Sequence, residues 1–158
     1  MPVSADDFRH ALGRFASGVT VVTTAVDGKL GGLTVSAFSS VSLDPPYILI
    51  CIDKRSSVIP LLRTSRVFGV NILSSDQSDV SNHFASRRED KFAGVSYRIG
   101  TLGVPVLEGV LAHLECKVTQ EVDGGDHFIY IGQVEHSSVD ESKEPLLYFH
   151  GKYRELAK

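Results

Sequence analysis

The stretch TVSAFSSVSLDPP, residues 34–46, combines residue types that could hold a flat ligand with a polar edge. Small hydroxylated side chains alternate with mostly small apolar ones, and the stretch ends at Pro45-Pro46. Such small side chains leave the backbone N–H and C=O groups accessible, so a ring could lie close to the chain and be recognised along its edge. A crowded barrel strand at a dimer interface explains the same composition. The two interpretations are compatible, because a ring could lie at that interface.

A second candidate is DKRSSV, residues 53–58, which joins the apolar run YILICI (47–52) to a short helix predicted over 56–65. Free N–H groups at a helix N-terminus, two serine hydroxyls, Lys54 and Arg55 would together form a cradle for phosphate. The alternative is a solvated loop in which a serine caps the helix.

A third candidate is GDHFIYIGQV, where Gly125, Asp126 and His127 form a turn that leads into a strand. His127 could hydrogen-bond a substrate or cofactor amide, or transfer a proton, although a histidine at a hairpin is commonly a surface residue. The chain has no glycine-rich nucleotide fingerprint, no P-loop and no G-x-S-x-G elbow. Its six histidines lack the spacing of a zinc site, so we expect no metal.

The bulk properties limit the classes of protein to consider. The chain has 158 residues, which predicts a single domain over 1–158, and its net charge of -3 gives no electrostatic reason to expect nucleic acid or an anionic membrane as a partner. No apolar run is long enough for a membrane helix, and the N-terminus lacks the pattern of a secretory signal. Cys51 and Cys116 lie inside apolar runs, so we expect reduced core thiols in a cytoplasmic protein.

The elements that must position these residues follow from periodicity and turn signals. Residues 4–16 predict a helix with Ser4 as its cap, an apolar stripe that includes Phe8 and Phe15, and Gly18 at its end. A further helix is expected over 75–90, with Val80 and Phe84 as its apolar pair. On the strand 111–122, Leu114, Cys116 and Val118 are expected on one face, with Glu115, Lys117 and Thr119 on the other. The other expected strands are 19–26, Leu30 into 34–46, 47–52, 67–73, 127–139 and 145–153.

The connections between these strands are mostly hairpins, as at Asp27-Gly28. The absence of alternating strands and helices argues against a doubly wound sheet. The pattern therefore predicts a mainly β protein, an antiparallel β-barrel with three short peripheral helices.

The chain also resembles the flavin reductase family with the FMN-binding split-barrel fold. These are short-chain NAD(P)H:flavin oxidoreductases that supply reduced flavin to two-component monooxygenases. The resemblance runs from about Phe8 to Tyr153 and rests on the order and spacing of several segments. They are FRHALGRFASGVTVVTT, GLTVSAFSSVSLDPP, VNILS, HFA followed by DKF, GDHFIYIGQV and PLLYFHGKY.

This resemblance implies the positions of the site residues. The edge of the flavin ring would face backbone and hydroxyl groups of four consecutive residues, although Ser36 stands where many relatives have Asn or Thr. His127 would lie by the nicotinamide, and Tyr153 would help to close its pocket. The remaining residues would line the ribityl chain, the phosphate or an adenylate tail. The resemblance implies Thr34, Val35, Ser36 and Ala37 at the ring edge, and Ser39 and Ser40 on the ribityl side. It implies Lys54, Ser56 and Ser57 at the phosphate, and Phe84, Ala85, Arg88 and Lys91 at the phosphate or an adenylate tail.

The activity implied is hydride transfer from NADH or NADPH to FMN or FAD, with NADH preferred, by a homodimer that passes reduced flavin to a partner monooxygenase. His127 would act as a positioning or polarising group. A non-enzymatic FMN-binding electron carrier on the same barrel is the main alternative. An oxidase of pyridoxamine phosphate is a further alternative, for which the sequence shows no extra basic cluster.

Overall fold

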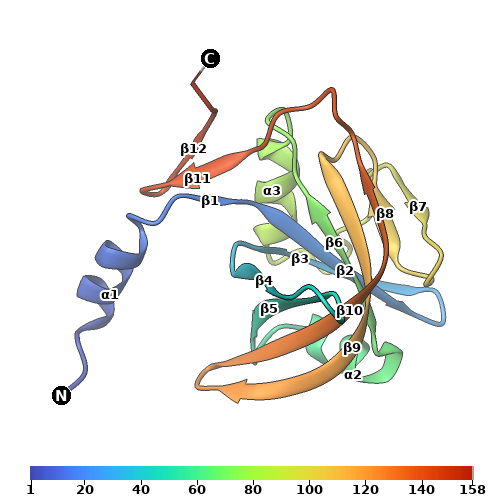
Figure 1. The fold of residues 1–158 in the computed structure, drawn as a ribbon, viewed down its shortest axis with the longest axis horizontal. Helices are drawn as coiled ribbons and strands as arrows, with labels where there is room; N and C mark the ends of the chain where they lie inside the picture. Colours follow the sequence, from blue (N-terminus) through green and yellow to red (C-terminus); the bar gives the residue numbers. More distant parts are fainter. Residues whose placement is uncertain (158) are drawn as a thin grey trace.

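The main body of the molecule is a seven-stranded antiparallel sheet that curls around a core (Figure 1). The structure is a computed structural model and describes residues 1–157. The order of the strands is β3-β2-β6-β9-β10-β5-β4, and the expected mainly β antiparallel fold with three short helices is confirmed. The strands are β2 (Thr20–Val26), β3 (Lys29–Val35), β4 (Phe38–Ser42), β5 (Tyr47–Asp53), β6 (Val67–Ile72), β9 (Ala112–Gly124) and β10 (His127–Val139).

The two ends of this sheet meet at one point in the chain. β3 and β4 lie at opposite ends of the strand order, yet only Ser36 and Ala37 separate them in sequence. The Ala37 carbonyl accepts a hydrogen bond of 3.1 Å from the Cys51 N–H, which holds this connection against β5. Within residues 1–157 no strand pairing closes the sheet between β3 and β4. We call these two residues the link.

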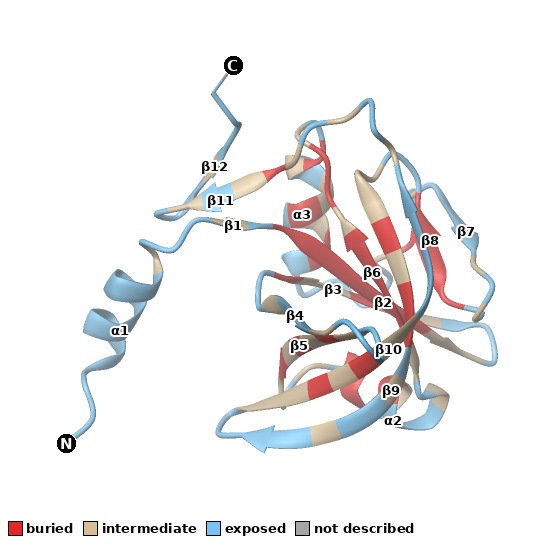
Figure 2. Ribbon diagram, viewed as in Figure 1, coloured by how far each residue is buried: buried red, intermediate tan, exposed pale blue. Residues whose placement is uncertain are grey.

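Two helices pack against the sheet, and a third projects from it. α2 (Val58–Ser65) and α3 (Ser78–Ala85) bury Leu62 and Phe84, whereas α1 (Ala5–Leu12) has no buried residue and extends away from the body (Figures 1 and 2). Ser4 caps α1 as expected, by accepting a hydrogen bond of 3.1 Å from the Asp7 N–H. Gly18 does not end this helix, because Gly13 is already its C-cap and Gly18 lies in a strand.

Short strands complete the fold at both ends of the chain. β1 (Ser17–Gly18) pairs with β11 (Leu147–Phe149), which forms a hairpin with β12 (Lys152–Arg154). A separate hairpin, β7 (Tyr97–Ile99) with β8 (Pro105–Leu107), covers part of the sheet and was not expected from the sequence. No helix of residues 1–157 has both the length and the apolar character needed to cross a membrane.

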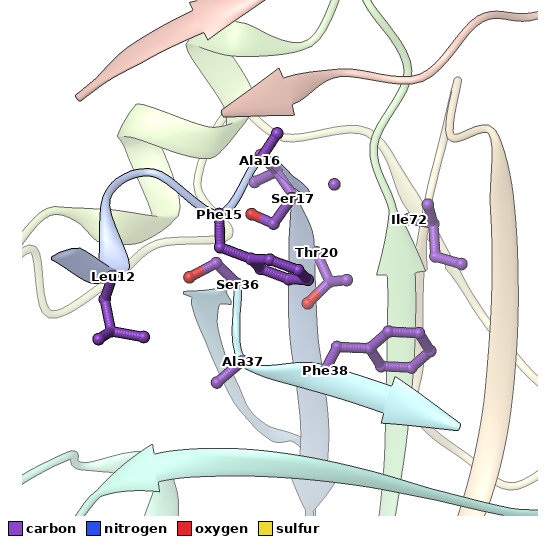
Figure 3. A pocket seen from close by; sticks show the side chains of 11 residues that line it. Leu12, Phe15, Ala16, Ser17, Thr20, Ser36, Ala37, Phe38 and Ile72 are labelled. Carbon is purple, nitrogen blue, oxygen red and sulfur yellow. The ribbon is translucent and has the colours of Figure 1, made fainter. Parts of the chain in front are cut away.

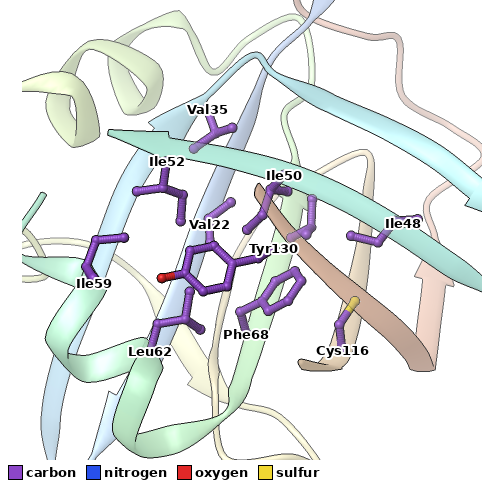
Figure 4. Close-up of a cluster of buried hydrophobic side chains, with 11 residues drawn as sticks. Val22, Val35, Ile48, Ile50, Ile52, Ile59, Leu62, Phe68, Cys116 and Tyr130 are labelled. Carbon is purple, nitrogen blue, oxygen red and sulfur yellow. The ribbon is translucent and has the colours of Figure 1, made fainter. Parts of the chain in front are cut away.

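The core has two parts, one on each face of the sheet. The inner part packs Val22, Ile50, Phe68 and Tyr130 with other aliphatic side chains (Figure 4). The outer part lies under α3 and contains Val21, from the same strand as Val22, since side chains alternate between the faces of a strand. The two-sided burial predicted for the run 47–52 is only partial, because its side chains alternate between buried and half-buried.

The alternation predicted for β9 is confirmed, because Leu114, Cys116 and Val118 pack against the inner core and Glu115 points to the other face. The Glu115 side chain is nevertheless buried, and its carboxylate accepts a hydrogen bond of 2.9 Å from the Leu102 N–H. His113 is buried beside it, with 3.6 Å between Nε2 and the Glu115 carboxylate. The segment that carries β7 and β8 covers this face of β9, which explains the burial. Cys51 and Cys116 are both free thiols, and burial raises the pKa of the Cys116 thiol to about 12.

Candidate functional site

The link joins two strands at the surface and exposes its backbone. Ser36 and Ala37 are both exposed, and within residues 1–157 neither of their N–H groups has a hydrogen-bond acceptor. Val35, directly before them, points into the core and is only 3% exposed, so it can meet a ligand only through its backbone. The link therefore presents unpaired donors next to small side chains.

Two hollows open on the link. The link hollow has a volume of about 640 Å³ and is mostly apolar, with Phe15, Thr20, Ser36, Phe38 and Ile72 in its walls (Figure 3). The tyrosine hollow, of about 430 Å³, is lined by Thr34, Ser36, Ser81, Tyr148 and Tyr153 among others. Ser36 contributes to both, so the link lies between an apolar and a polar cavity.

Hydrogen bonds around the buried Ser81 hold the walls of the tyrosine hollow together. The Ser81 carbonyl accepts a bond of 2.6 Å from the Thr34 hydroxyl, which ties α3 to β3. The Tyr153 hydroxyl donates to the Asn82 side-chain oxygen at 2.9 Å and lies 2.7 Å from the Ser81 hydroxyl. A phenol has one proton, so Ser81 must be the donor to Tyr153. The sequence offered no signal for Ser81 or Asn82, which sit in an ordinary polar stretch.

The expected phosphate loop is only partly assembled as predicted. Ser57 is the N-cap residue of α2, but it is the Ser56 hydroxyl that accepts a hydrogen bond, from the Val58 N–H at 3.2 Å. The exposed Ser57 hydroxyl has no hydrogen-bond partner within residues 1–157. It lines a third cavity of about 340 Å³, which we call the lysine hollow, together with Gly32, Arg88 and Lys91.

Lys91 supplies the positive charge nearest to this serine. Its ammonium donates to the carbonyls of Gly32 and Phe84 at 3.1 and 2.9 Å, and no carboxylate pairs with it among residues 1–157. An ammonium group has three donors, so one is left for a ligand. Partial burial lowers the pKa of Lys91. An anion bound in the hollow would raise this pKa again, because it favours the charged ammonium.

Lys54 and Arg55 are engaged elsewhere. The Lys54 ammonium pairs with Asp123 on β9 and lies 4.9 Å from the centroid of the Phe128 ring. Arg55 binds Asp53 through both guanidinium and backbone, and these hydrogen bonds hold the pKa of the Asp53 carboxyl well below its usual range. A role for Lys54 at a phosphate would require this ion pair to open, and it stays a prediction.

The remaining expected residues fall into three groups. Ser39 and Ser40 are exposed on β4, whereas the Phe84 ring is fully buried, with its centroid 5.2 Å from that of Phe92. Phe84 therefore meets the site only through its carbonyl, which binds Lys91. Ala85 lines the tyrosine hollow.

His127 lies apart from the hollows. It pairs with Asp53 in the ladder between β10 and β5, and its Nδ1 is 2.7 Å from the Asp126 carboxylate. It lines none of the cavities described above, so within this chain it does not share a pocket with Tyr153. The predicted role of both at one nicotinamide pocket stays a prediction.

The family is decided by a match over nearly the whole chain. Residues 12–157 match the flavin reductase like domain. The chain belongs to this family. It is 43% identical over 148 residues to the reductase subunit HsaB of a flavin-dependent monooxygenase from Mycobacterium tuberculosis, covering 92% of this chain and 79% of that protein.

Two further relatives carry more specific names. An NADH-dependent flavin reductase from a Rhodococcus species is 43% identical over 153 residues, which cover 94% of this chain and 84% of that protein. Among solved structures, the NADH:FAD oxidoreductase SgcE6 of Streptomyces globisporus, in complex with NAD and FAD fragments, superposes with a TM-score of 0.93 at 35% identity. The alignment covers 99% of this chain and 97% of SgcE6. The family expected from the sequence is thus confirmed.

Proposed function

We propose that this flavin reductase family member is an NADH-dependent enzyme that reduces free flavin and supplies it to a flavin-dependent monooxygenase. The observation that carries the proposal is the exposed link, whose unpaired N–H groups lie between an apolar and a polar hollow. The names of the relatives support the same reaction. A flavin bound at the link accepts hydride from the nicotinamide of NADH, and the redox chemistry belongs to these two molecules.

The residues at the link suit the ring of a flavin. The apolar walls of the link hollow accept a flat aromatic surface, and the Ser36 and Ala37 N–H groups are donors for its polar edge. Donors aimed at a position where negative charge develops favour the reduced state of a bound flavin. The protein thus contributes placement and electrostatics, through backbone groups that need no special side chain.

The phosphate of the flavin is held, in this proposal, at the lysine hollow. Ser57 offers a free hydroxyl beside the first turn of α2, and Lys91 offers an ammonium donor without a carboxylate partner in the described chain. Arg88 lines the same hollow and adds a second cation. A phosphate placed there would be bound by charge-assisted hydrogen bonds, which are stronger than neutral ones.

Tyr153 and His127 are assigned to the nicotinamide. Tyr153 is fixed by Ser81 and Asn82 at the wall of the tyrosine hollow, next to Ser36. His127 is half-buried and is oriented by Asp126, so it can donate or accept a hydrogen bond but is not needed to transfer a proton to the flavin. Both therefore position the hydride donor.

A homodimer is part of the proposal. The side chains of Phe8, Leu12 and Phe15 are 55%, 54% and 79% exposed in the single chain, although they form one apolar stripe along α1 and the residues after it. Leu12 and Phe15 also line the link hollow, so a second copy packed on this stripe would lie close to the flavin. Contiguous exposed apolar surface of this kind marks an interaction site.

The test follows NADH oxidation by absorbance with purified protein and added FMN, FAD or riboflavin, each repeated with NADPH. We expect turnover that scales with free flavin and is faster with NADH. Tight flavin that survives desalting, without turnover, would instead indicate the non-enzymatic electron carrier. No binding of any flavin would contradict the assignment of the site.

A further inference from the structure

The link is held in place through carbonyl groups, which leaves its N–H groups free. The Val35 carbonyl, at the end of β3, accepts a hydrogen bond of 2.6 Å from the hydroxyl of Thr20 on β2. The Ser36 carbonyl accepts a hydrogen bond of 3.0 Å from the Phe38 N–H. Both carbonyls that precede a free N–H group of the link are therefore engaged.

These two carbonyls determine where the free N–H groups point. A trans peptide bond is planar, so its C=O and N–H groups point in opposite directions. The Val35 carbonyl shares its plane with the Ser36 N–H, and the Ser36 carbonyl shares its plane with the Ala37 N–H. The hydrogen bond from Thr20 to the Val35 carbonyl therefore also fixes the direction of the Ser36 N–H.

Thr20 occupies a buried position that an apolar side chain could fill. It is only 4% exposed, and it lies two residues before Val22, on the same inner face of β2. It lines the link hollow together with Phe38 and Ile72 (Figure 3). Valine has a similar shape and would bury no polar group, so packing alone does not require a hydroxyl here. The acceptor of this hydroxyl is the Val35 carbonyl.

The same hydrogen bond strengthens the donor on the other side of the peptide plane. Hydrogen bonds in a chain polarise one another, so a Val35 carbonyl that accepts from Thr20 makes the Ser36 N–H a better donor. This matters most when the acceptor is charged, because charge-assisted hydrogen bonds are the stronger ones. In the proposed function the acceptor becomes negative when the flavin is reduced.

We propose that Thr20 is a positioning residue of the reductase, which orients and polarises the Ser36 N–H through the Val35 carbonyl and so favours reduced over oxidised flavin. This inference rests on the proposed function and adds a residue that acts on the flavin through the peptide between Val35 and Ser36. In the sequence, Thr20 is one of several β-branched residues in the strand predicted over 19–26.

The test compares the dissociation constants of oxidised FMN and of FMN reduced with dithionite, measured by calorimetry without oxygen. Thr20→Val replaces the hydroxyl by a methyl group, which cannot donate to the Val35 carbonyl. We expect it to weaken the binding of reduced FMN at least about threefold more than that of oxidised FMN. Thr20→Ala should change the ratio of the two constants in the same direction, and Thr20→Ser, which keeps the hydroxyl, should restore the wild-type ratio.

Thr23 offers a matched control on the same strand. Its hydroxyl donates a hydrogen bond of the same length, 2.6 Å, to the Pro105 carbonyl, and the residue is fully buried. It lines none of the three hollows described above. Thr23→Val should therefore destabilise the fold in urea unfolding without changing the ratio of the two FMN dissociation constants.

The outcomes separate this inference from the proposed function. An unchanged ratio in Thr20→Val or in Thr20→Ala would overturn the role of Thr20, as would a changed ratio in Thr20→Ser or in Thr23→Val. NADH oxidation with added flavin would in that case still support the reductase. Failure of the wild-type protein to bind FMN in either redox state would remove the proposed function and this inference with it.

Discussion

Replacing Tyr153 by Phe removes a single oxygen atom that takes part in two hydrogen bonds, one with Ser81 and one with Asn82. Each such bond contributes about 0.5–1.5 kcal/mol net, so we expect a loss of about 1–3 kcal/mol in the free energy of unfolding. Ser81 is only 1% exposed, and in Tyr153→Phe its hydroxyl would be buried without an acceptor. Because an unsatisfied buried donor is costly, we expect the loss of unfolding free energy to lie toward the upper end of this range.

The double variant Tyr153→Phe with Ser81→Ala tests this reasoning further. Removing both partners leaves no unsatisfied buried donor. The double variant should therefore lose less free energy of unfolding than the two single variants lose in sum, with a difference of about 0.5 kcal/mol or more. Tyr148→Phe is the control. The Tyr148 ring stacks edge to face on Tyr153 at 5.4 Å, but its hydroxyl has no partner in residues 1–157.

Urea unfolding at one fixed protein concentration measures these differences, and NADH oxidation measures the effect on function. We expect Tyr153→Phe to raise the KM for NADH more than it changes the affinity for flavin, because it loosens the wall of the tyrosine hollow. Strictly additive losses, or equal losses in Tyr153→Phe and Tyr148→Phe, would refute the hydrogen-bond argument.

Three further predictions concern the binding of NADH and of the flavin phosphate. His127→Ala should raise the KM for NADH more than it lowers kcat, and an unchanged KM in steady-state kinetics would count against a positioning role. In titrations, Ser57→Ala should weaken the binding of FMN but not of riboflavin. Lys54→Ala should change FMN binding less, because the Lys54 ammonium is already paired with Asp123. A larger effect of Lys54→Ala than of Ser57→Ala would show that Lys54, and not Ser57, binds the phosphate. Burial lowers the pKa of the Lys91 ammonium, and a bound FMN phosphate favours the charged form of Lys91. The affinity for FMN should therefore fall as the pH rises through the lowered pKa of Lys91. This fall should occur at a lower pH than for an ordinary lysine, whose pKa is about 10.4. Riboflavin titrated over the same pH range should show no such fall, and a parallel fall would exclude Lys91 as the cause.

Local sequence signals predicted the parts of the fold that local interactions determine. The cap at Ser4 and the pair Val80 and Phe84 placed two helices correctly, although the structure ends both earlier than expected. The burial of Glu115 could not be predicted, because it depends on the segment that carries β7 and β8, which covers this face of β9. Alternation along a strand shows which residues share a face, but not whether a second layer covers that face.

The candidate site shows the same division. The exposed small residues at 36–37 and the serines before α2 were visible as composition and spacing. The pairing of Lys54 with Asp123 was not, since β9 approaches this loop only through the folded sheet. The role of Ser81 was also hidden, because its partners Thr34 and Tyr153 lie 47 and 72 positions away in the chain.

The shortness of the link restricts how sequences with this architecture can vary in length. One residue inserted between Val35 and Phe38 would shift β4 by one position against β5 and turn its side chains to the opposite face, unless the chain bulged outward. A bulge would displace the exposed N–H groups proposed to bind the flavin. Insertions and deletions should therefore be excluded from residues 36–37, which alone separate β3 from β4.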